Sequence, residues 1–196
     1  MDTLNVIGST IMSVKKEYDK FTVDFYHDFG TDRLPNLRKY TIDEAMNDSY
    51  FMDEIIPQYI NRLHKWESAS ESLFFLELKY DFRDRIKLID TIMKKMHHNI
   101  GKEMYVSKVL NDFFGIRIIL SDVIQNRNEI CRLLDNDRDK KIISRFYLRN
   151  DGNYHAIHCY FQDRNTHLPW ELQIWDESRK KVNYSEHVRH ERERNN

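Results

Sequence analysis

Residues 154–161 and 170–175 alternate between apolar and hydrogen-bonding side chains, which is the period of a β-strand with two different faces. One set of alternate positions is apolar and would face a core: Ile157, Cys159, Phe161, Trp170, Leu172 and Ile174. The other set includes groups that a strand with nothing to bind rarely collects: Tyr154, His158, Glu171 and Gln173. If the strands pair with their apolar sides together, the pattern predicts a binding or catalytic site on one surface of a sheet.

The composition favours a single globular domain and disfavours several classes of protein. The chain has 196 residues, 40% of them hydrophobic, with only 5 glycines and 3 prolines, so long disordered linkers are not expected. Its two cysteines, Cys131 and Cys159, lack a CxxC partner, which disfavours a disulfide framework and a zinc site and favours a reducing, cytoplasmic location. No apolar run approaches the roughly 20 residues of a membrane span, so no membrane partner is expected.

The overall charge carries no signature of a nucleic-acid-binding protein, because 31 basic and 32 acidic residues give a formal net charge of −1. Any such partner would be held by local basic patches. The candidates are Lys15 with Lys16, the segment 138–149 and the segment that begins at Arg179. Each of these patches is equally typical of a solvated surface.

The hydrophobic periodicity predicts helices first and a mixed sheet afterwards. We expect a helix over 5–28, a loop over 30–36, and a helix opened by the capping box of Thr41 and Glu44, which Pro57 limits or kinks before it continues to Trp66. Strands are expected over 73–80, 115–120, 141–148, 154–161 and 170–175, with helices over 86–96, over 121–134 and from about residue 177. The predicted fold is α+β, a mixed β-sheet flanked by helices, in one domain with an N-terminal helical region (1–70) and a catalytic core (71–196).

The common phosphate-binding and hydrolytic motifs are missing from the sequence: GxxxxGK, GxGxxG after a strand, HExxH and GxSxG. What remains is a basic group ahead of two separated acids, Asp112 and Glu171; its members are Arg83, Arg85, Lys87, Lys94 and Lys95. Transfer of a polyphosphate group needs cations that neutralise phosphate oxygens and carboxylates that hold Mg²⁺. The combination is compatible with such chemistry. Taken alone it is weak evidence, because Asp and Glu residues occur at the ends of many strands.

The order of these groups resembles the synthetase domain of the RelA/SpoT family of pyrophosphokinases. Four segments carry the resemblance: RIK at 85–87 with KKM at 94–96, NDFFGIR at 111–117, YHAIH at 154–158 and ELQI at 171–174. They are similar to the family patterns R-x-K…K, D-x-x-G-I-R, G-Y-x-S-I-H and E-I-Q-I-R, and they occur in family order. The resemblance implies a nucleotidyltransferase-like fold with a mixed sheet.

On the donor side, the resemblance implies that Arg85, Lys87 and Lys95 hold the adenine and the phosphates of ATP, the diphosphate donor. Asp112 would bind Mg²⁺. Glu171 would bind or orient the metal and help to activate the attacking 3′-hydroxyl of the acceptor. These roles require the carboxylates of Asp112 and Glu171 to converge around one divalent ion.

On the acceptor side, the resemblance implies that Tyr154 stacks on the acceptor's base and that His158 and Gln173 line the acceptor pocket. The chain departs from the family pattern in this region, because Trp175 stands where the family has an arginine. We interpret this loss of a cation as disfavouring a site that grips the 5′-diphosphate of a free nucleotide.

These features are similar to the toxic branch of the small alarmone synthetases. We therefore expect an ATP-dependent pyrophosphokinase that transfers the β,γ-diphosphate of ATP to a ribose 3′-hydroxyl, most simply at the 3′ CCA end of tRNA. It would act as a translation-inhibiting toxin that a partner antitoxin protein neutralises. Two alternatives stay open: synthesis of (p)ppGpp or a related nucleotide from GDP or GTP, and an inactive module that binds nucleotide or RNA. The presence of both Asp112 and Glu171 argues against the inactive module.

Overall fold

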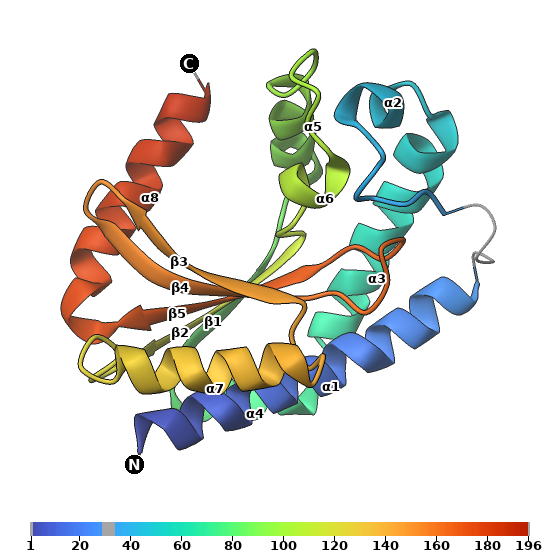
Figure 1. The fold of residues 1–196 in the computed structure, drawn as a ribbon. Coiled ribbons are helices and arrows are strands. Elements are labelled where there is room, and N and C mark those ends of the chain that lie inside the picture. Colours follow the sequence, from blue (N-terminus) through green and yellow to red (C-terminus); the bar gives the residue numbers. More distant parts are fainter. Residues whose placement is uncertain (1, 29–33, 196) are drawn as a thin grey trace.

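The computed structural model describes residues 2–28 and 34–195, and for residues 187 and 190–195 it describes the backbone alone. Its helical elements are α1 (Thr3–His27), α2 (Ile42–Met46), the π-helical η2 (Tyr50–Ile55), α3 (Ile56–Glu67), α4 (Glu71–Lys79), α5 (Ile89–His97), α6 (Val106–Val109), α7 (Arg127–Asp139), the 3₁₀ turn η3 (Glu177–Arg179) and α8 (Lys180–Asn195). Its strands are β1 (Asp81–Ile86), β2 (Phe114–Leu120), β3 (Arg145–Asp151), β4 (Tyr154–Phe161) and β5 (Trp170–Asp176), as Figure 1 shows.

The five strands form one sheet in the order β1-β2-β5-β4-β3. Strands β2 and β5 are parallel and the other three neighbouring pairs are antiparallel, so the sheet is mixed. Gly152 and Asn153 form the two-residue turn between β3 and β4, and the positive φ of Gly152 (60°) suits the first central position of such a turn. The sheet and its flanking helices confirm the predicted α+β class.

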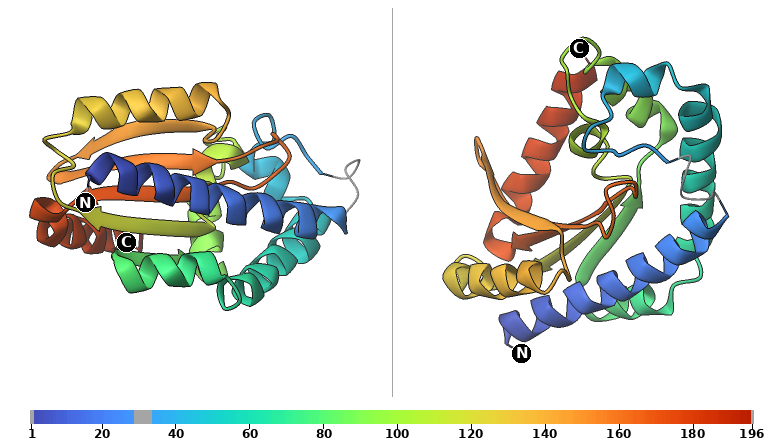
Figure 2. Two further views of the ribbon diagram at one scale, coloured as in Figure 1. Left: turned by 90° about the horizontal axis from the view of Figure 1, so that it is seen from below. Right: turned by 45° about the vertical axis from the view of Figure 1, so that its right-hand side comes forward.

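Helices α1 and α7 lie side by side against one face of the sheet (Figures 1 and 2). The ring of Tyr18 in α1 meets Trp170 of β5 edge-on at 5.5 Å, and its hydroxyl donates to Oδ1 of Asp163 at 3.0 Å. Both rings are fully buried, and each burial stabilises the fold by roughly 1.5–3 kcal/mol. Because this core occupies one side of the sheet, the hydrogen-bonding side chains of the strands are left on the other.

The N-terminal helical region agrees with the prediction in outline. The first helix lies within two residues of the expected range, and the capping box of Thr41 and Glu44 is formed. The single kinked helix expected from residue 41 to residue 66 is instead three elements, α2, η2 and α3. Pro57 lies in the first turn of α3, directly after the π-helical η2, so the proline coincides with a change of helix type rather than with a helix end. The loop predicted over 30–36 lies mostly outside the described residues.

The strand predicted over 73–80 is wrong, because this segment forms helix α4. Ser70 precedes the helix, and its side chain accepts a hydrogen bond from the backbone N–H of Leu73. Leu73 and Leu76 are buried at the spacing of one helical turn, whereas Phe74 and Phe75 between them are exposed. A short apolar run without strict alternation fits a helix and a buried strand equally well.

The first strand follows this helix and was not predicted. Strand β1 has the sequence DFRDRI, in which Phe82 and Ile86 are buried while Arg83 and Arg85 are exposed. The strand therefore has the expected period of two, but its charged face conceals it from a search for apolar segments. Because β1 ends at Ile86, the next helix begins at Ile89 rather than at residue 86.

Other boundaries differ by a few residues from the predictions. The helix expected from Ser121 begins at Arg127 after a run of turns, and β3 lies about four residues later than expected. Strands β2, β4 and β5 match their predicted ranges within one residue, and the final helix follows the turn at 177–179. Among the described helices, none has both the length and the apolarity needed to cross a membrane.

Candidate active site

The polar face of the sheet is the surface opposite α1 and α7, and the strand pairing arranges its side chains in rows. One row, read from β1 to β3, is Arg85, Gly115, Glu171, Tyr160 and Arg145. The next row is Arg83, Arg117, Gln173, His158 and Tyr147. Directly paired residues point to the same face of a sheet, so these rows bring together side chains that are far apart in the sequence.

Glu171 lies at the centre of a hydrogen-bonded network on this face. Its Oε1 accepts from Nδ1 of His158 at 2.8 Å and from the hydroxyl of Tyr160 at 2.6 Å, and its Oε2 accepts from Nε2 of Gln173 at 2.7 Å. Burial raises the pKa of Glu171, but the hydrogen bonds from His158 and Tyr160 outweigh it and hold the pKa below its ordinary value. Glu171, only 6% exposed, is therefore an ionised carboxylate in a fixed orientation.

A second set of contacts holds the donors of Glu171 in place. Nε2 of His158 lies 3.0 Å from the hydroxyl of Tyr154, and the oxygen of that hydroxyl accepts from Nε1 of Trp175 at 3.2 Å. Nη2 of Arg117 donates to Oε1 of Gln173 at 3.2 Å, and its guanidinium lies 3.7 Å from the ring centroid of Trp175. The prediction that a carboxylate, an amide, an imidazole and a phenol gather on one surface is confirmed.

Tyr154 has its hydroxyl in this network, but its ring is 2% exposed. Trp175 packs edge-on against the ring at 5.8 Å, and the guanidinium of Arg149 lies 5.5 Å from its centroid. A base could stack on Tyr154 only after one of these neighbours had moved. The role as a stacking platform, implied by the family resemblance, stays a prediction that this burial does not favour.

Lys87, Lys95 and Asp112 form a second charged group. The backbone N–H of Lys87 bonds to the carbonyl of Phe113 at 2.9 Å, which places Lys87 at the end of β1 beside the start of β2. Its Nζ donates to Oδ2 of Asp112, and Nζ of Lys95 donates to Oδ1 at 3.1 Å.

Burial dominates the electrostatics of this charged group. Lys87 is 3% exposed, and burial lowers its pKa to about 8, although the charge of Asp112 partly offsets this effect. Burial also raises the pKa of Asp112, but the charges of Lys95 and Lys87 outweigh it and hold the pKa well below its ordinary range. The group is therefore a cationic cradle with one carboxylate at its centre.

Asp112 and Glu171 belong to neighbouring parts of the same site. Asp112 lies two residues before β2, and Gly115 in that strand pairs with Glu171. The charge of Asp112 acts to raise the pKa of Glu171. Because Gly115 has no side chain, no side chain in the row separates Arg85 from Glu171.

The two carboxylates suit Mg²⁺ as a partial ligand set. Among the described residues no group of three or more His, Cys, Asp or Glu side chains could hold a metal ion. Mg²⁺ commonly binds one or two protein carboxylates together with substrate phosphates and water. A carboxylate has about four acceptor positions, of which Asp112 uses two on its lysines and Glu171 three on its donors. Each carboxylate therefore keeps at least one acceptor position for a metal ion that binds together with a substrate phosphate.

Sequence reasoning gave no role to three residues of the network: Arg117, Tyr147 and Tyr160. Arg117 was part of a quoted motif without a role, and Tyr160 shares the alternation of His158. Tyr147 pairs directly with His158, and its hydroxyl lies 2.9 Å from that of Tyr160. The strand register that connects these side chains to Glu171 was the missing information.

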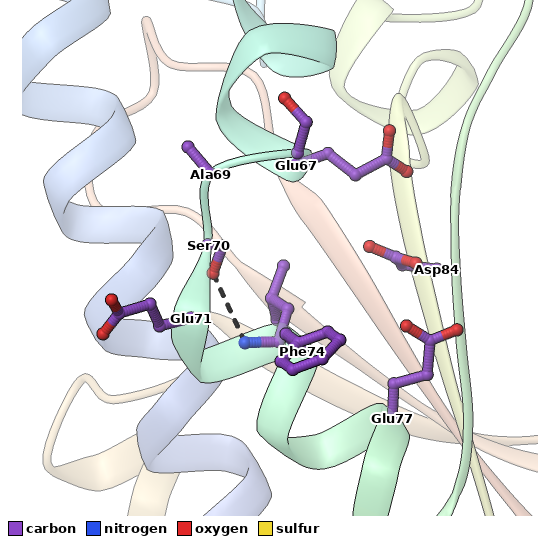
Figure 3. A pocket seen from close by; sticks show the side chains of 9 residues that line it. Glu67, Ala69, Ser70, Glu71, Phe74, Glu77 and Asp84 are labelled. Atoms are coloured by element: carbon purple, nitrogen blue, oxygen red, sulfur yellow. Dashed lines mark hydrogen bonds between the residues drawn. The ribbon is translucent and has the colours of Figure 1, made fainter.

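A pocket of about 500 Å³ lies away from the polar face, where the end of α3 and the start of α4 approach β1 (Figure 3). Four of its lining residues are acidic: Glu67, Glu71, Glu77 and Asp84. Burial and the charges of Glu67 and Glu77 raise the pKa of Asp84 to about 6. An acidic lining repels phosphate, so the chemistry suggested by the polar face does not belong to this pocket.

Residues 84–193 match the model of the region found in RelA/SpoT proteins, and this match covers more than half of the chain and nearly all of the site. The chain belongs to the RelA/SpoT family. Its class of activity is that of a pyrophosphokinase, so the family resemblance expected from the four segments is confirmed at this level. The family match does not distinguish the toxic, tRNA-modifying branch from other branches.

Several solved structures are similar to the chain. Small alarmone synthetase 2 from Bacillus subtilis is 16% identical, with 73% of this chain and 84% of that chain covered and a TM-score of 0.46. Small alarmone synthetase 1 from the same organism is 17% identical, with coverages of 72% and 78% and a TM-score of 0.41. A GTP pyrophosphokinase family protein from Streptococcus pneumoniae is 17% identical, with coverages of 71% and 74% and a TM-score of 0.38. No curated protein matches the chain.

Proposed function

We propose that this RelA/SpoT-family chain transfers the β,γ-diphosphate of ATP to a ribose 3′-hydroxyl, and that the acceptor is the 3′ CCA end of tRNA. The observation that carries the proposal is the ionised Glu171, fixed by three donors beside the cradle of Lys87 and Lys95. Diphosphate transfer demands little covalent work from the protein. It needs an aligned hydroxyl and neutralisation of charge on many oxygens, and this arrangement supplies both.

On the donor side, Arg85, Lys87 and Lys95 bind the adenine and the phosphates of ATP in this proposal. Asp112 and Glu171 would hold Mg²⁺, which would supply neutralisation of the phosphate charge. The ion pairs of the two lysines with Asp112 keep their ammonium groups pointing into the site before ATP arrives. Because three donors and Mg²⁺ fill the acceptor positions of Glu171, one donor must give way to the attacking hydroxyl, whose hydrogen bond Glu171 then accepts and whose proton it takes.

On the acceptor side, His158 and Gln173 line the pocket and Tyr154 supports it through its hydroxyl. The place of the family's arginine is taken by Trp175, which is fully buried and holds no phosphate. An RNA end needs no grip on a free 5′-diphosphate, which favours tRNA over GDP or GTP as the acceptor. A diphosphate on the 3′-hydroxyl blocks aminoacylation, so the enzyme would act as a toxin that inhibits translation and needs a neutralising antitoxin.

The acceptor can be identified by incubating the protein with γ-labelled ATP and either deacylated tRNA or GDP and GTP. Label on tRNA supports the proposal, and label on guanine nucleotide alone supports the alternative of an alarmone synthetase. Periodate-oxidised tRNA, which lacks an intact 3′-terminal ribose diol, is the matched control and should stay unlabelled. Label on neither acceptor, with ATP still bound, would favour an inactive binding module.

A further inference from the structure

Strand β3 is an edge strand of the sheet, and it presents a regular set of side chains on the polar face. Its neighbour in the sheet order is β4 alone. Arg145, Tyr147 and Arg149 occupy alternate positions and pair with Tyr160, His158 and Ala156, so all three point to the polar face. We call these three residues the β3 stripe.

Tyr147 is the exposed aromatic ring of this stripe. Its ring lies nearly parallel to those of His158 (centroids 5.3 Å apart, 16° between planes) and Tyr160 (5.7 Å, 17°). The side chain is nevertheless 40% exposed, whereas Tyr154 is almost completely buried. One side of the Tyr147 ring therefore rests on β4 while the other side is open to a planar ligand.

Tyr147 is also connected to the carboxylate that would activate the acceptor. Tyr160 donates its hydroxyl proton to Oε1 of Glu171, so the hydroxyl of Tyr147 donates to the oxygen of Tyr160. A base on the open side of Tyr147 would be separated from Glu171 by two side chains, Tyr147 itself and Tyr160. This separation suits a nucleotide that precedes the terminal one, because the terminal ribose can then extend across the polar face to Glu171.

The two arginines of the stripe lie on either side of the ring along the strand. The guanidinium of Arg145 is 4.5 Å from the ring centroid of Tyr160, and that of Arg149 donates to Oδ2 of Asp151 at 3.2 Å. An exposed aromatic platform flanked by cations on a strand is how proteins commonly bind single-stranded RNA, with bases stacked and phosphates neutralised.

We infer that the β3 stripe binds the single-stranded 3′ end of the acceptor RNA, with a base that precedes the terminal nucleotide stacked on Tyr147 and the phosphates contacted by Arg145 and Arg149. The inference deepens the proposed function and rests on it. It adds an exposed base platform at Tyr147 to the buried Tyr154. It also explains how a chain with a net charge of −1 can hold RNA, because only a short local patch is involved.

The stacking role is tested with the variants Tyr147→Leu, which removes the ring, and Tyr147→Phe, which keeps it. Base stacking on an aromatic ring contributes about 1–3 kcal/mol, so Tyr147→Leu should raise KM for deacylated tRNA by about 5- to 150-fold. KM for ATP should not change, and Tyr147→Phe should restore KM for tRNA. Phe75→Leu on α4 is the control, because Phe75 is 65% exposed but lies on a helix outside the polar face.

The phosphate contacts are tested by the salt dependence of binding to a short single-stranded RNA that ends in CCA. Loss of one contact in Arg145→Gln or Arg149→Gln should reduce the slope of log K against log salt by about 0.7. Arg62→Gln on α3 is the matched control, since Arg62 is partly exposed and ion-paired with Asp24 of α1, the helix that covers the opposite face of the sheet. An unchanged slope in both stripe variants overturns the assignment of the arginines.

The two readouts separate failure of this inference from failure of the proposed function. If tRNA is labelled but Tyr147→Leu leaves its KM unchanged, or raises KM for ATP equally, the stripe is not the acceptor site while the proposed reaction stands. The RNA-binding measurement needs no catalysis. Binding that is lost in Tyr147→Leu and retained in Tyr147→Phe supports the stripe even if guanine nucleotide proves to be the labelled acceptor. Equal RNA binding by the parent protein, Tyr147→Leu and Tyr147→Phe overturns the inference that Tyr147 stacks on a base.

Discussion

The hydroxyl of Tyr160 and the imidazole of His158 converge on one oxygen, Oε1 of Glu171, at 2.6 Å and 2.8 Å. Two donors on one oxygen fix the rotation of the carboxylate and direct its other oxygen. Burial, followed by the charge of Glu171, raises the pKa of Tyr160 far above its ordinary value. The phenol therefore stays protonated and remains a donor throughout the working pH range of an enzyme.

Tyr160→Phe should lower kcat by about 10- to 100-fold, because a hydrogen bond to a charged group contributes about 1.5–3 kcal/mol. KM for ATP should change little, since the ring remains in place. Tyr18→Phe is a matched control: Tyr18 is also buried and donates to a carboxylate, Asp163, but on the opposite face of the sheet. Steady-state kinetics check the prediction, and equal kcat values in the two variants would show that Tyr160 is only structural.

Glu171→Gln should reduce the rate by roughly 10²- to 10⁴-fold, the range expected for a positioned acid–base group. The amide is nearly isosteric, but it carries no charge and takes up no proton from a hydroxyl. ATP affinity and rate are measured separately by equilibrium binding and single-turnover kinetics. A near-normal rate would remove Glu171 from the mechanism.

The polar face could be predicted from the sequence because strand alternation alone decides which side chains share a surface. Glu171 and Gln173 are two residues apart on one strand, and His158 has the same parity relative to its apolar neighbours. The register between strands was beyond this reasoning. The parallel pairing that places Gly115 beside Glu171 depends on contacts across more than fifty residues of sequence.

The sequence pattern also could not predict which side chains of the polar face are exposed, as Tyr154 shows. Alternation correctly places Tyr154 on the polar face, but Ile119, Ala156 and Trp175 form a small apolar cluster with it there. Tyr154 is buried in this cluster, whereas Tyr147 on the edge strand stays exposed. Which of two tyrosines is available to a ligand therefore depends on neighbours from other strands, here β2 and β5.

Lys87→Met should raise KM for ATP by about tenfold or more, because it removes a buried cation from the proposed phosphate cradle. Asp112 keeps its 3.1 Å ion pair with Lys95, so the loss of stability should be well below the several kcal/mol of an unpaired buried charge. Lys94→Met is the control, since Lys94 is the exposed neighbour of Lys95 on α5. Similar KM values in both variants would exclude Lys87 from ATP binding.

Asp84→Asn should increase the stability of the protein above pH 6. Burial and the charges of Glu67 and Glu77 raise the pKa of Asp84 to about 6, whereas an unfolded aspartate ionises near 3.9. Between about pH 4 and pH 6 the folded state therefore binds more protons than the unfolded state, and the free energy of unfolding falls as the pH rises.

The asparagine variant lacks this titration, so the two proteins should differ little near pH 4 and most at pH 7 and above. Because Asp84 is partly exposed, solvent screening limits the gain to about 1 kcal/mol, or about 2–4 °C in Tm. Glu71→Gln is the control, because Glu71 lines the same pocket but does not act on the pKa of Asp84. Thermal unfolding from pH 4 to pH 8 measures the difference. Parallel Tm profiles for the parent and Asp84→Asn would mean that solvent screens the acidic pocket in Figure 3 well enough for ionised Asp84 not to destabilise the folded state.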